Sequence, residues 1–312
     1  MRAAPAKEFH AREAVRSIFY APYLAAVQAG FLEKEGLKGD LGVVPQGRDP
    51  FEMLNRGEIQ VVQNAPSTSF SLLEAGRKDA PLHVAAINDR DGFYIVSRKP
   101  ADDFRWKDLE GATVVPASFG VQPWACLMFC LQEQGVDADR VTLMQGLSSM
   151  QEAEEAFRAG EGDYVHLQNP NALNVVTDGV GHLAASVGEA LGPIAFSTLA
   201  MSRRLLTEET ETAQAFMRAY LAARQWILES DAETIAEALH PLFPETAKMV
   251  LAKSVAGYKE LGTWLPHPGI ARQSYERALD MWLAAGQITR RYPFEEVVTN
   301  ELIEKTIGMD KT

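Results

Sequence analysis

The stretch QVVQNAPSTS, residues 60–69, starts as a buried β-strand and then turns into amides, a proline and hydroxyl side chains. Residues 163–172, DYVHLQNPNA, repeat this order: a strand, then Gln-Asn, then Pro. The same local pattern written twice in one chain is typical of an internal repeat. We therefore expect these two stretches to end equivalent strands of two related units.

The repeat extends towards the N-terminus of both stretches. Residues 31–47, FLEKEGLKGDLGVVPQG, resemble residues 130–146, CLQEQGVDADRVTLMQG, at a constant spacing of 99 that relates Gly36 to Gly135. Each segment is the end of a helix, a glycine, a β-branched or apolar run, and then Gln-Gly. Beyond residue 146 the spacing grows to 103, as expected when one unit carries an insertion in a surface loop.

Each unit alternates strands with helices, an order that predicts an α/β sheet in each of two lobes. Residues 83–99 and 192–204 have strand patterns and are expected to carry the chain between the lobes, and the pattern after residue 205 is helical. We therefore predict an α/β protein with two Rossmann-like lobes, mixed sheets, a two-strand hinge and a helical C-terminal region. Lobe I would comprise residues 1–95 and 196–312, and lobe II residues 96–195.

The composition and charge of the chain argue against some classes of function. The 312 residues are 46% hydrophobic and 23% charged, as in an ordinary globular protein with a large core. The formal net charge of −12 argues against a nucleic-acid partner, which favours a basic protein surface. No apolar run reaches the length of about 18–20 residues that a membrane-spanning helix needs, so we expect no membrane span.

The N-terminal sequence MRAAPAKEFHAREAV lacks the apolar core of a secretory signal peptide. Two locations stay open: the periplasm if a signal peptide was trimmed, and the cytoplasm if Met1 is the native start. The two cysteines, Cys126 and Cys130, lie four residues apart on one face of a predicted helix. We expect buried apolar thiols there rather than a metal site.

In open α/β sheets, ligands bind beyond the carboxyl ends of the strands. That rule selects loops in both units where aromatic rings, amides, hydroxyl groups and one arginine form a candidate small-molecule site. Arg48 would pair with a carboxylate, sulfonate or phosphate, and helix N-termini at residues 67–68 and 148–149 would donate N–H groups to an acidic ligand. The predicted ligand-binding residues are Ser17, Phe19, Tyr20, Tyr23, Gln46, Arg48, Asn64, Ser67, Ser118, Phe119, Gln122, His166, Gln168 and Asn169.

Several of these residues also have a purely structural interpretation. Ser67 and Ser148 suit helix N-caps that need no ligand. Phe19 and Tyr23 would fit in a core, and Arg48 would fit on a solvated loop. His166 lies inside a predicted strand, where a hydrogen-bonded structural histidine and a catalytic base are both open.

Enzyme motifs are largely missing. The chain contains no Gly-x-Gly-x-x-Gly after a strand, no Walker loop, no Gly-x-Ser-x-Gly, no His-Glu-x-x-His and no Cys-x-x-Cys. Asp89 and Asp91 fall at the predicted hinge, where they would serve as turn residues or as acid–base groups. We assign no catalytic residue, no metal and no cofactor from the sequence.

Three stretches carry a family pattern: SIFYAPYLAAVQAGFLEKEGLKGDLGVVPQGRDPFEMLNRGEIQVVQNAPS (17–67), WKDLEGATVVPASFG (106–120) and GEGDYVHLQNPNA (160–172). In their order and spacing, residues 12–205 resemble the NMT1/THI5-like family of sulfonate- and nitrate-type substrate-binding proteins of ABC transporters. The resemblance implies a type 2 periplasmic-binding-protein fold that clamps a small organic ligand, anionic or aromatic, by hinge closure. It also implies an ABC transporter permease as a partner.

The same fold hosts enzymes, so fold alone does not decide the function. Relatives that make thiamin pyrimidine carry His and Lys in the first loop and a cysteine-rich iron motif, and aromatic sulfinate desulfinases carry a Cys nucleophile in that loop. Here the loop reads SIFYAPYLAAVQ, residues 17–28, and has none of these. The alternative function is a cytoplasmic decarboxylase, hydrolase or pyrimidine-synthase-like enzyme acting on a small aromatic or heterocyclic acid.

Overall fold

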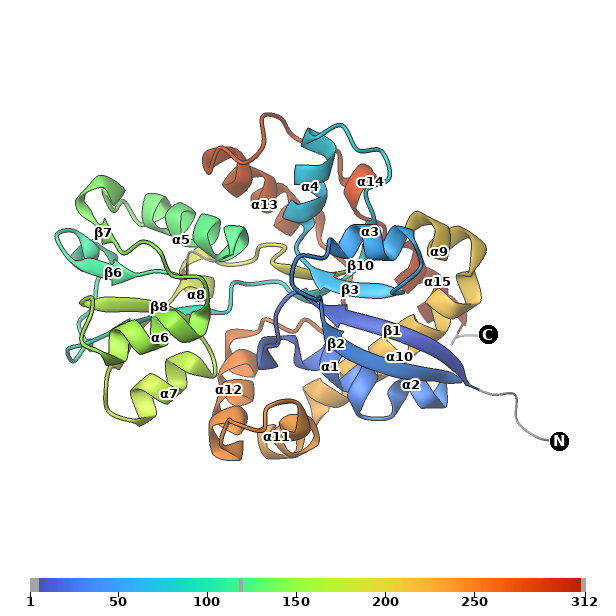
Figure 1. Cartoon of the computed structure of the whole chain (residues 1–312), viewed down its shortest axis with the longest axis horizontal. Helices are drawn as coiled ribbons and strands as arrows, with labels where there is room; N and C mark the ends of the chain where they lie inside the picture. The colour runs from blue at the N-terminus through green and yellow to red at the C-terminus, as the bar shows by residue number, and fades with distance from the viewer. Residues whose placement is uncertain (1–5, 118–119, 310–312) are drawn as a thin grey trace.

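The computed structural model describes residues 6–117 and 120–309 and arranges them in two lobes, each built on a five-stranded sheet (Figure 1). Lobe I has the strand order β2-β1-β3-β10-β4, and lobe II has the order β7-β6-β8-β5-β9. The strands of lobe I are β1 (Lys7–Glu13), β2 (Leu37–Val43), β3 (Val61–Asn64), β4 (Leu82–Asn88) and β10 (Ser197–Met201). Those of lobe II are β5 (Phe93–Ser97), β6 (Thr113–Val115), β7 (Thr142–Leu143), β8 (Tyr164–Gln168) and β9 (His182–Ser186).

The two sheets have the same topology, which confirms the predicted fold class. In lobe I β1 runs parallel to its neighbours β2 and β3, and β10 is antiparallel to both of its neighbours. In lobe II β6 runs parallel to β7 and β8, and β5 takes the antiparallel position. Each sheet is therefore mixed, with one strand that runs against the others.

Helices cover the faces and edges of both sheets. Those of lobe I up to the first crossing are α1 (Ala21–Gln28), α2 (Phe31–Lys34), α3 (Pro50–Asn55) and α4 (Pro66–Glu74), preceded by the 3-10 turn Ile18–Tyr20. Lobe II has α5 (Val121–Glu133), α6 (Met150–Arg158), α7 (Asn171–Thr177) and α8 (Val187–Leu191), with 3-10 turns at Trp106–Leu109 and Ala138–Arg140. The C-terminal region has α9 (Arg203–Glu208), α10 (Thr210–Glu229), α11 (Ala232–Leu239), the 3-10 turn His240–Leu242, α12 (Lys248–Leu261), α13 (Arg272–Ala284), α14 (Phe294–Val297) and α15 (Glu301–Met309).

The repeat predicted from the sequence is present in the backbone. Gly36 and Gly135, which are 99 residues apart, have φ values of 74° and 70° and both precede the second strand of a unit. A positive φ favours glycine because other residues place a Cβ atom against the backbone there. The matching glycines therefore mark the same turn in both lobes.

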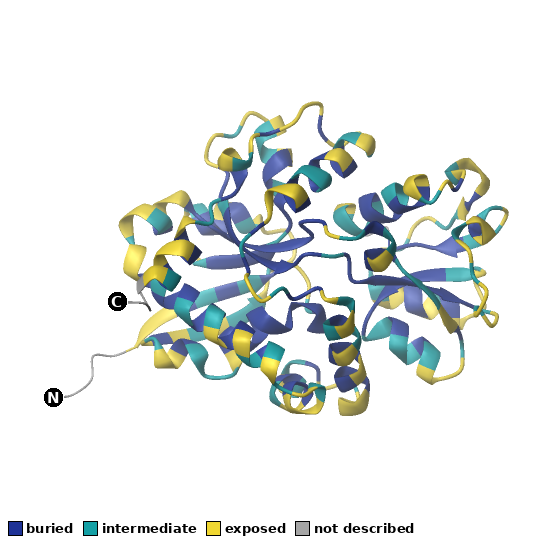
Figure 2. Ribbon diagram, turned by 180° about the vertical axis from the view of Figure 1, so that it is seen from behind, coloured by how far each residue is buried: buried dark blue, intermediate teal, exposed yellow. Residues whose placement is uncertain are grey.

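The core is formed where the sheets meet their helices. Figure 2 shows buried residues along the strands and the crossing segments, with exposed residues on the outer faces of the helices. In lobe I, for example, Phe9 of β1 stacks on Phe216 of α10 with ring centroids 5.0 Å apart. Among the described residues, no helix has the combination of length and apolar character that a bilayer crossing requires.

The chain crosses between the lobes after β4 and again before β10. β5 pairs along its whole length with β8 and β9 of lobe II, so the first crossing falls at residues 89–92, before the predicted boundary at residue 95. The sequence led us to expect that the C-terminal helices only complete lobe I. In the structure they also contact lobe II. In Figure 1 α12 lies beside α7 and α13 lies beside α5, so helices from the end of the chain contact lobe II on both sides of the crossing.

Candidate functional site

A cavity of about 560 Å³ lies between the two lobes, beyond the carboxyl ends of β1, β3 and β8. Its walls come from both lobes, since Asn64 ends β3 and Gln168 ends β8. This is the edge at which open α/β sheets bind ligands. The cavity is lined by Ala14, Val15, Tyr20, Gln63, Asn64, Ala65, Ser67, Thr68, Ser71, Phe93, Gly120, Val121, Gln122, Pro123, Ser148, Ser149, Met150, Gln168, Phe196, Ser197 and Trp282.

Aromatic rings form much of the apolar wall. Tyr20, Phe93, Phe196 and Trp282 all line the cavity. The rings of Phe93 and Phe196 have centroids 6.4 Å apart, and the buried ring of Phe19 contacts Phe196 from behind at 5.7 Å. Rings held in place by such packing offer flat apolar faces, which favours an aromatic or otherwise flat ligand.

The polar wall is uncharged. Among the described lining residues there is no Lys, Arg, His, Asp or Glu, and the polar groups are amides and hydroxyls. The N-terminus of α5 also reaches the cavity at Gly120 and Val121, and no side chain of the described residues caps it. Free backbone N–H groups at a helix N-terminus attract acceptor oxygens. The cavity can therefore hold acceptor groups without a cationic side chain.

Two hydrogen bonds tie the end of β8 to lobe I and to the C-terminal helices beside the cavity. The hydroxyl of Ser17 donates to Oε1 of Gln168 across 2.6 Å, and the backbone N–H of Asn169 donates to the hydroxyl of Tyr258 on α12 across 3.0 Å. All four residues are buried. Both contacts meet the end of β8, so this strand end is tied to the first loop of lobe I and to the C-terminal helices.

Five of the predicted ligand-binding residues come together in the cavity wall. Tyr20, Asn64 and Ser67 reach it from lobe I, and Gln122 and Gln168 reach it from lobe II. All five follow strands whose carboxyl ends meet at the cleft. Ser118 and Phe119 precede the lining residues of α5 but lie outside the described residues.

Neither residue predicted in the loop after β2 lines this cavity. Arg48 forms an ion pair with Glu58, and its side chain is 47% exposed. Gln46 is exposed in the same loop. The loop therefore faces away from the cavity, and the charged partner that we expected for an anionic ligand does not reach it.

Three further predicted residues are buried next to the cavity without lining it. Ser17 is engaged with Gln168, as described above. Phe19 is a core residue whose ring lies 4.7 Å from that of Tyr258. Tyr23 is fully buried and donates its hydroxyl to the backbone carbonyl of Arg12 across 2.9 Å. Phe19 and Tyr23 thus follow the structural interpretation given above.

His166 and Asn169 belong to the buried end of β8 and of the loop after it. The ring of His166 packs 4.7 Å from that of Phe93 and does not line the cavity, and burial lowers the pKa of His166 to about 3. Neither ring nitrogen has a hydrogen-bond partner among the described residues, contrary to the hydrogen-bonded histidine that we considered. Asn169 instead lines a groove on the other side of the crossing, next to α12.

The predicted N-caps are wrong by one or two residues. The N-cap of α4 is Ala65, because Pro66 begins the helix, and that of α6 is Ser149, whose hydroxyl accepts from the N–H of Glu152. Ser67 and Ser148 lie beside these caps and line the cavity.

Sequence reasoning missed several lining residues. Phe93 begins β5 and Phe196 precedes β10, in segments whose pattern predicts only connections between the lobes, and Trp282 comes from α13, whose pattern predicts a helix that wraps around lobe I. The indole N–H of Trp282 donates to Oε1 of Gln122 across 2.9 Å. For Phe93, the only signal in the sequence that could have predicted a place in the cavity wall was an aromatic residue next to a predicted crossing strand.

Two buried carboxyl groups lie close to the cleft. Burial raises the pKa of Glu13 to about 7, even though Arg16 pairs with it at 2.5 Å. Burial likewise raises the pKa of Asp91 to about 7, although the backbone N–H of Phe93 donates to the carboxylate and by itself would lower this pKa. Glu13 ends β1 and Asp91 lies in the first crossing, so both belong to the framework behind the cavity wall.

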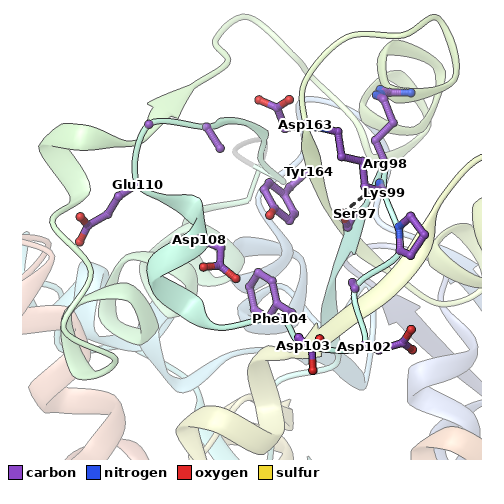
Figure 3. Close-up of a pocket in the computed structure, with 14 residues that line it drawn as sticks. Ser97, Arg98, Lys99, Asp102, Asp103, Phe104, Asp108, Glu110, Asp163 and Tyr164 are labelled. Carbon is purple, nitrogen blue, oxygen red and sulfur yellow. Dashed lines mark hydrogen bonds between the residues drawn. The ribbon is translucent and has the colours of Figure 1, made fainter.

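A second cavity, of about 630 Å³, lies at the other end of the strands of lobe II (Figure 3). Ser97 pairs with Tyr164 there, whereas Phe93 pairs with Gln168 at the cleft. Its acidic side chains include Asp163, which accepts from the N–H of Thr113. The guanidinium of Arg98 is bound to the carbonyls of Phe157, Glu161 and Gly162. No predicted site residue lines this cavity, and Asp163 and Arg98 are engaged in contacts within lobe II.

Metal chemistry has no candidate site within residues 6–117 and 120–309, where no cluster of His, Cys, Asp and Glu could hold an ion. Cys126 and Cys130 are buried, as expected for apolar thiols. Burial raises the pKa of both thiols, which keeps them protonated.

Comparisons with known proteins agree with this architecture. The "Putative binding protein YtlA" of Bacillus subtilis (strain 168) is 28% identical over 294 residues, which are 94% of this chain and 88% of that protein. The nitrate-binding protein NrtA of Synechocystis PCC 6803 superposes with a TM-score of 0.76 at 13% identity, over 98% of this chain and 89% of that one. The alkanesulfonate-binding protein SsuA of Xanthomonas axonopodis pv. citri, bound to MOPS, gives 0.69 at 21% identity, over 95% and 99%.

The family follows from the sequence match together with this fold. Residues 15–241, which include every strand of both sheets except β1, match the NMT1-like family. That range covers more than half of the 312 residues. The chain belongs to the NMT1-like family.

Proposed function

We propose that this protein is a solute-binding protein that holds one small organic molecule between its two lobes. The observation that carries the proposal is the interlobe cavity, whose walls come from the strand ends of both sheets. In the described part of the chain, two crossings of the main chain join the sheets, so the lobes can move about them to admit and release a ligand. A relative named as a binding protein and neighbours named as sulfonate- and nitrate-binding proteins support this function.

The ligand we propose is aromatic or heterocyclic. The rings of Tyr20, Phe93, Phe196 and Trp282 favour a flat molecule, and the cavity volume of about 560 Å³ suits a compound of one or two rings with substituents. Because Arg48 does not reach the cavity, an anionic group is not required for recognition. Any negative charge would be held by amides, hydroxyls and the N-terminus of α5.

We propose an ABC transporter permease as the macromolecular partner. One structural neighbour, from Staphylococcus aureus, is described as the ligand-binding component of an ABC-type import system, with a TM-score of 0.72 at 13% identity. A binding protein of this kind would deliver its ligand to the permease and be recovered unchanged. The proposal can therefore be separated from an enzymatic function by following the ligand.

Thermal shift followed by isothermal titration calorimetry tests the proposal. We expect at least one aromatic or heterocyclic compound to bind with one-to-one stoichiometry and to be recovered unmodified from the protein by mass spectrometry. A compound that is consumed on incubation would contradict reversible binding and support the enzyme alternative.

A matched pair of variants locates the site. Val15 and Val43 are both exposed valines of lobe I, at 40% and 43%, but only Val15 lines the cavity. Val15→Trp should fill the cavity mouth and abolish binding, whereas Val43→Trp should bind as the wild type does. Equal binding by both variants would place the ligand elsewhere.

A further inference from the structure

The amide groups at the cleft have fixed orientations, and Asn64 shows why. Its Oδ1 accepts from the backbone N–H of Ala65 across 2.8 Å and from the hydroxyl of Thr68 across 2.7 Å. A backbone N–H can only donate, so the atom facing it must be the oxygen and not the nitrogen of the amide. The Nδ2 group is left over, and it has no partner among the described residues. Asn64 therefore offers a donor at the wall of lobe I.

Gln122 in lobe II is fixed in the same way. Its Oε1 accepts from the indole N–H of Trp282 across 2.9 Å, and an indole nitrogen has no acceptor capacity. The Nε2 group of Gln122 is buried and has no partner among the described residues. A buried donor without a partner costs free energy until an acceptor reaches it. Other atoms of the side chain line the cavity, so a small movement of the amide as the lobes close on a ligand would bring an acceptor to this donor.

The amide of Gln168 also accepts through its oxygen and keeps an N–H₂ group that is free among the described residues, whereas the amide of Gln63 has no free group. Oε1 of Gln168 accepts from the hydroxyl of Ser17, whose oxygen already accepts from the N–H of Phe19. Gln63 uses both ends of its amide inside the protein, since Oε1 accepts from Ala14 and Nε2 donates to Ser197. The donors left free at the cavity wall thus come from both lobes.

We propose that the ligand presents hydrogen-bond acceptors at two points of its ring system, one to Asn64 of lobe I and one to Gln122 of lobe II. The acceptors would be carbonyl, carboxylate or sulfonate oxygens. The proposal rests on the proposed function, because it concerns the ligand of the same cavity. Closing the lobes on such a molecule would satisfy a donor on each side, so the pattern of acceptors would select which compounds hold the cleft closed.

Pairs of compounds with one ring and opposite hydrogen-bonding groups test the proposal. Naphthalene-2,6-disulfonate, 2,6-diacetylnaphthalene and 2,6-bis(aminomethyl)naphthalene share a ring, and they carry anionic acceptors, neutral acceptors and cationic donors at two points; terephthalate and 1,4-bis(aminomethyl)benzene form a smaller pair. By calorimetry we expect the acceptor members to bind about tenfold or more tightly than the amines. The protein has a net charge of −12, so overall electrostatic attraction would favour the amines and cannot produce this result.

The outcomes separate the two proposals. If the amines bind as tightly as the acceptors or more tightly, the acceptor proposal is wrong while the binding function stands. If no compound of any type binds in this set or in a wider panel of aromatic and heterocyclic solutes, the binding function itself is contradicted. The affinity of the sulfonate compared with that of the ketone shows whether the preferred acceptor carries a charge.

Variants that invert the donors give a second test. Asn64→Asp and Gln122→Glu keep the oxygen that accepts from the protein and replace the free N–H₂ group by a second oxygen. Both positions lie at helix N-termini, where a carboxylate is tolerated. We expect each variant to lose about tenfold or more in affinity for the acceptor compounds and to gain affinity for the amines.

Gln132→Glu is the matched control, because it makes the same change on α5 at an exposed residue outside the cavity. It should bind every compound as the wild type does. If Asn64→Asp and Gln122→Glu keep the wild-type preference, or if the control inverts it equally, the two amides do not select the ligand.

Discussion

The hydroxyl of Ser17 in lobe I donates a 2.6 Å hydrogen bond to Oε1 of Gln168 in lobe II, although the two residues are 151 positions apart in the chain. Both residues are buried at the edge of the interlobe cavity. Gln168 ends β8, and the next residue, Asn169, is bound to Tyr258 of α12. The end of one strand is thus fixed to lobe I by two contacts, which makes it the natural point at which to test lobe closure.

We predict that Ser17→Ala opens the lobes. It removes a helix-cap hydrogen bond to Phe19, which costs about 1 kcal/mol, and leaves the buried Oε1 of Gln168 without a donor, which costs roughly 1–3 kcal/mol more in the closed arrangement. The distance between spin labels at the exposed residues Lys38 and Lys107 should increase, and ligand affinity should fall.

Ser202→Ala is the control for this variant. Ser202 is also buried and caps a helix by accepting from Leu205 across 3.2 Å, but it has no hydrogen bond to the described residues of lobe II. The free energy of unfolding of this variant should fall by an amount similar to the cap contribution in Ser17→Ala, and the distance between the spin labels should stay that of the wild type. The same distance change in both variants would show that cap loss, and not the bond to Gln168, controls closure.

Trp282 should report ligand binding by fluorescence. It is one of five tryptophans and the only one among the described residues that line the cavity. Trp282→Phe should remove most of the ligand-induced change in tryptophan emission and weaken binding, because Gln122 loses the donor that orients its amide. Trp106→Phe, in lobe II beside Phe104, should keep that change. A full signal in Trp282→Phe would mean that the ligand binds away from this indole.

The buried carboxyl group of Asp91 should make stability depend on pH. Burial raises its pKa from 3.8 to about 7. Between these values the native protein keeps a proton that the unfolded chain has lost, so the free energy of unfolding falls as the pH rises from about 4 to 7 and is constant above. The decrease from this group is on the order of 4 kcal/mol.

Urea midpoints at pH 5 and pH 8 check this sign. Asp91→Asn keeps an oxygen for the N–H of Phe93 and removes the titration, so the decrease between the two pH values should become smaller. It should not vanish, because burial also raises the pKa of Glu13 to about 7. Asp102→Asn, at an exposed carboxyl group, should leave the decrease unchanged. A larger decrease in Asp91→Asn would contradict the assigned direction.

Gly188→Ala should destabilise the crossing between the lobes. A Cβ atom at Gly188 would lie 2.0 Å from the backbone carbonyl oxygen of Asp91, which cannot rotate away as a side chain can. We expect a loss of at least 2–3 kcal/mol, roughly the upper range for overpacking. Gly308→Ala, in α15 with open space around the new methyl group, should instead be neutral or gain roughly 0.5–1 kcal/mol. Equal stability of the two variants, measured by urea unfolding, would show that the contact relaxes freely.

The sequence predicted the fold because local signals suffice for it. The repeat of glycines, strands and Gln-Asn turns defines two equivalent units, and the structure confirms two sheets of the same topology. The carboxyl-end rule then leads to Asn64 and Gln168, which do reach one cavity. It fails for Arg48, because the rule identifies a loop and not the direction of a side chain, and a nearby Glu58 holds this one at the surface.

The remaining part of the site depends on contacts between distant segments. Trp282 lies on an amphipathic helix whose apolar stripe reads as ordinary core, and only the docking of α13 against α5 brings it to the cleft. Phe93 and Phe196 read as residues of connecting strands, and only the crossing of the chain makes them a wall. Such placements follow from tertiary packing, which periodicity along the sequence does not encode.

A crystal structure of the protein with the tightest-binding compound from the thermal-shift panel tests the central claim most directly. We expect one unmodified molecule in the interlobe cavity, between the aromatic rings and within hydrogen-bonding distance of both Asn64 and Gln122. A molecule bound instead beside Phe104 and Tyr164 in the outer cavity of lobe II, or a chemically altered one in the cleft, would contradict the account.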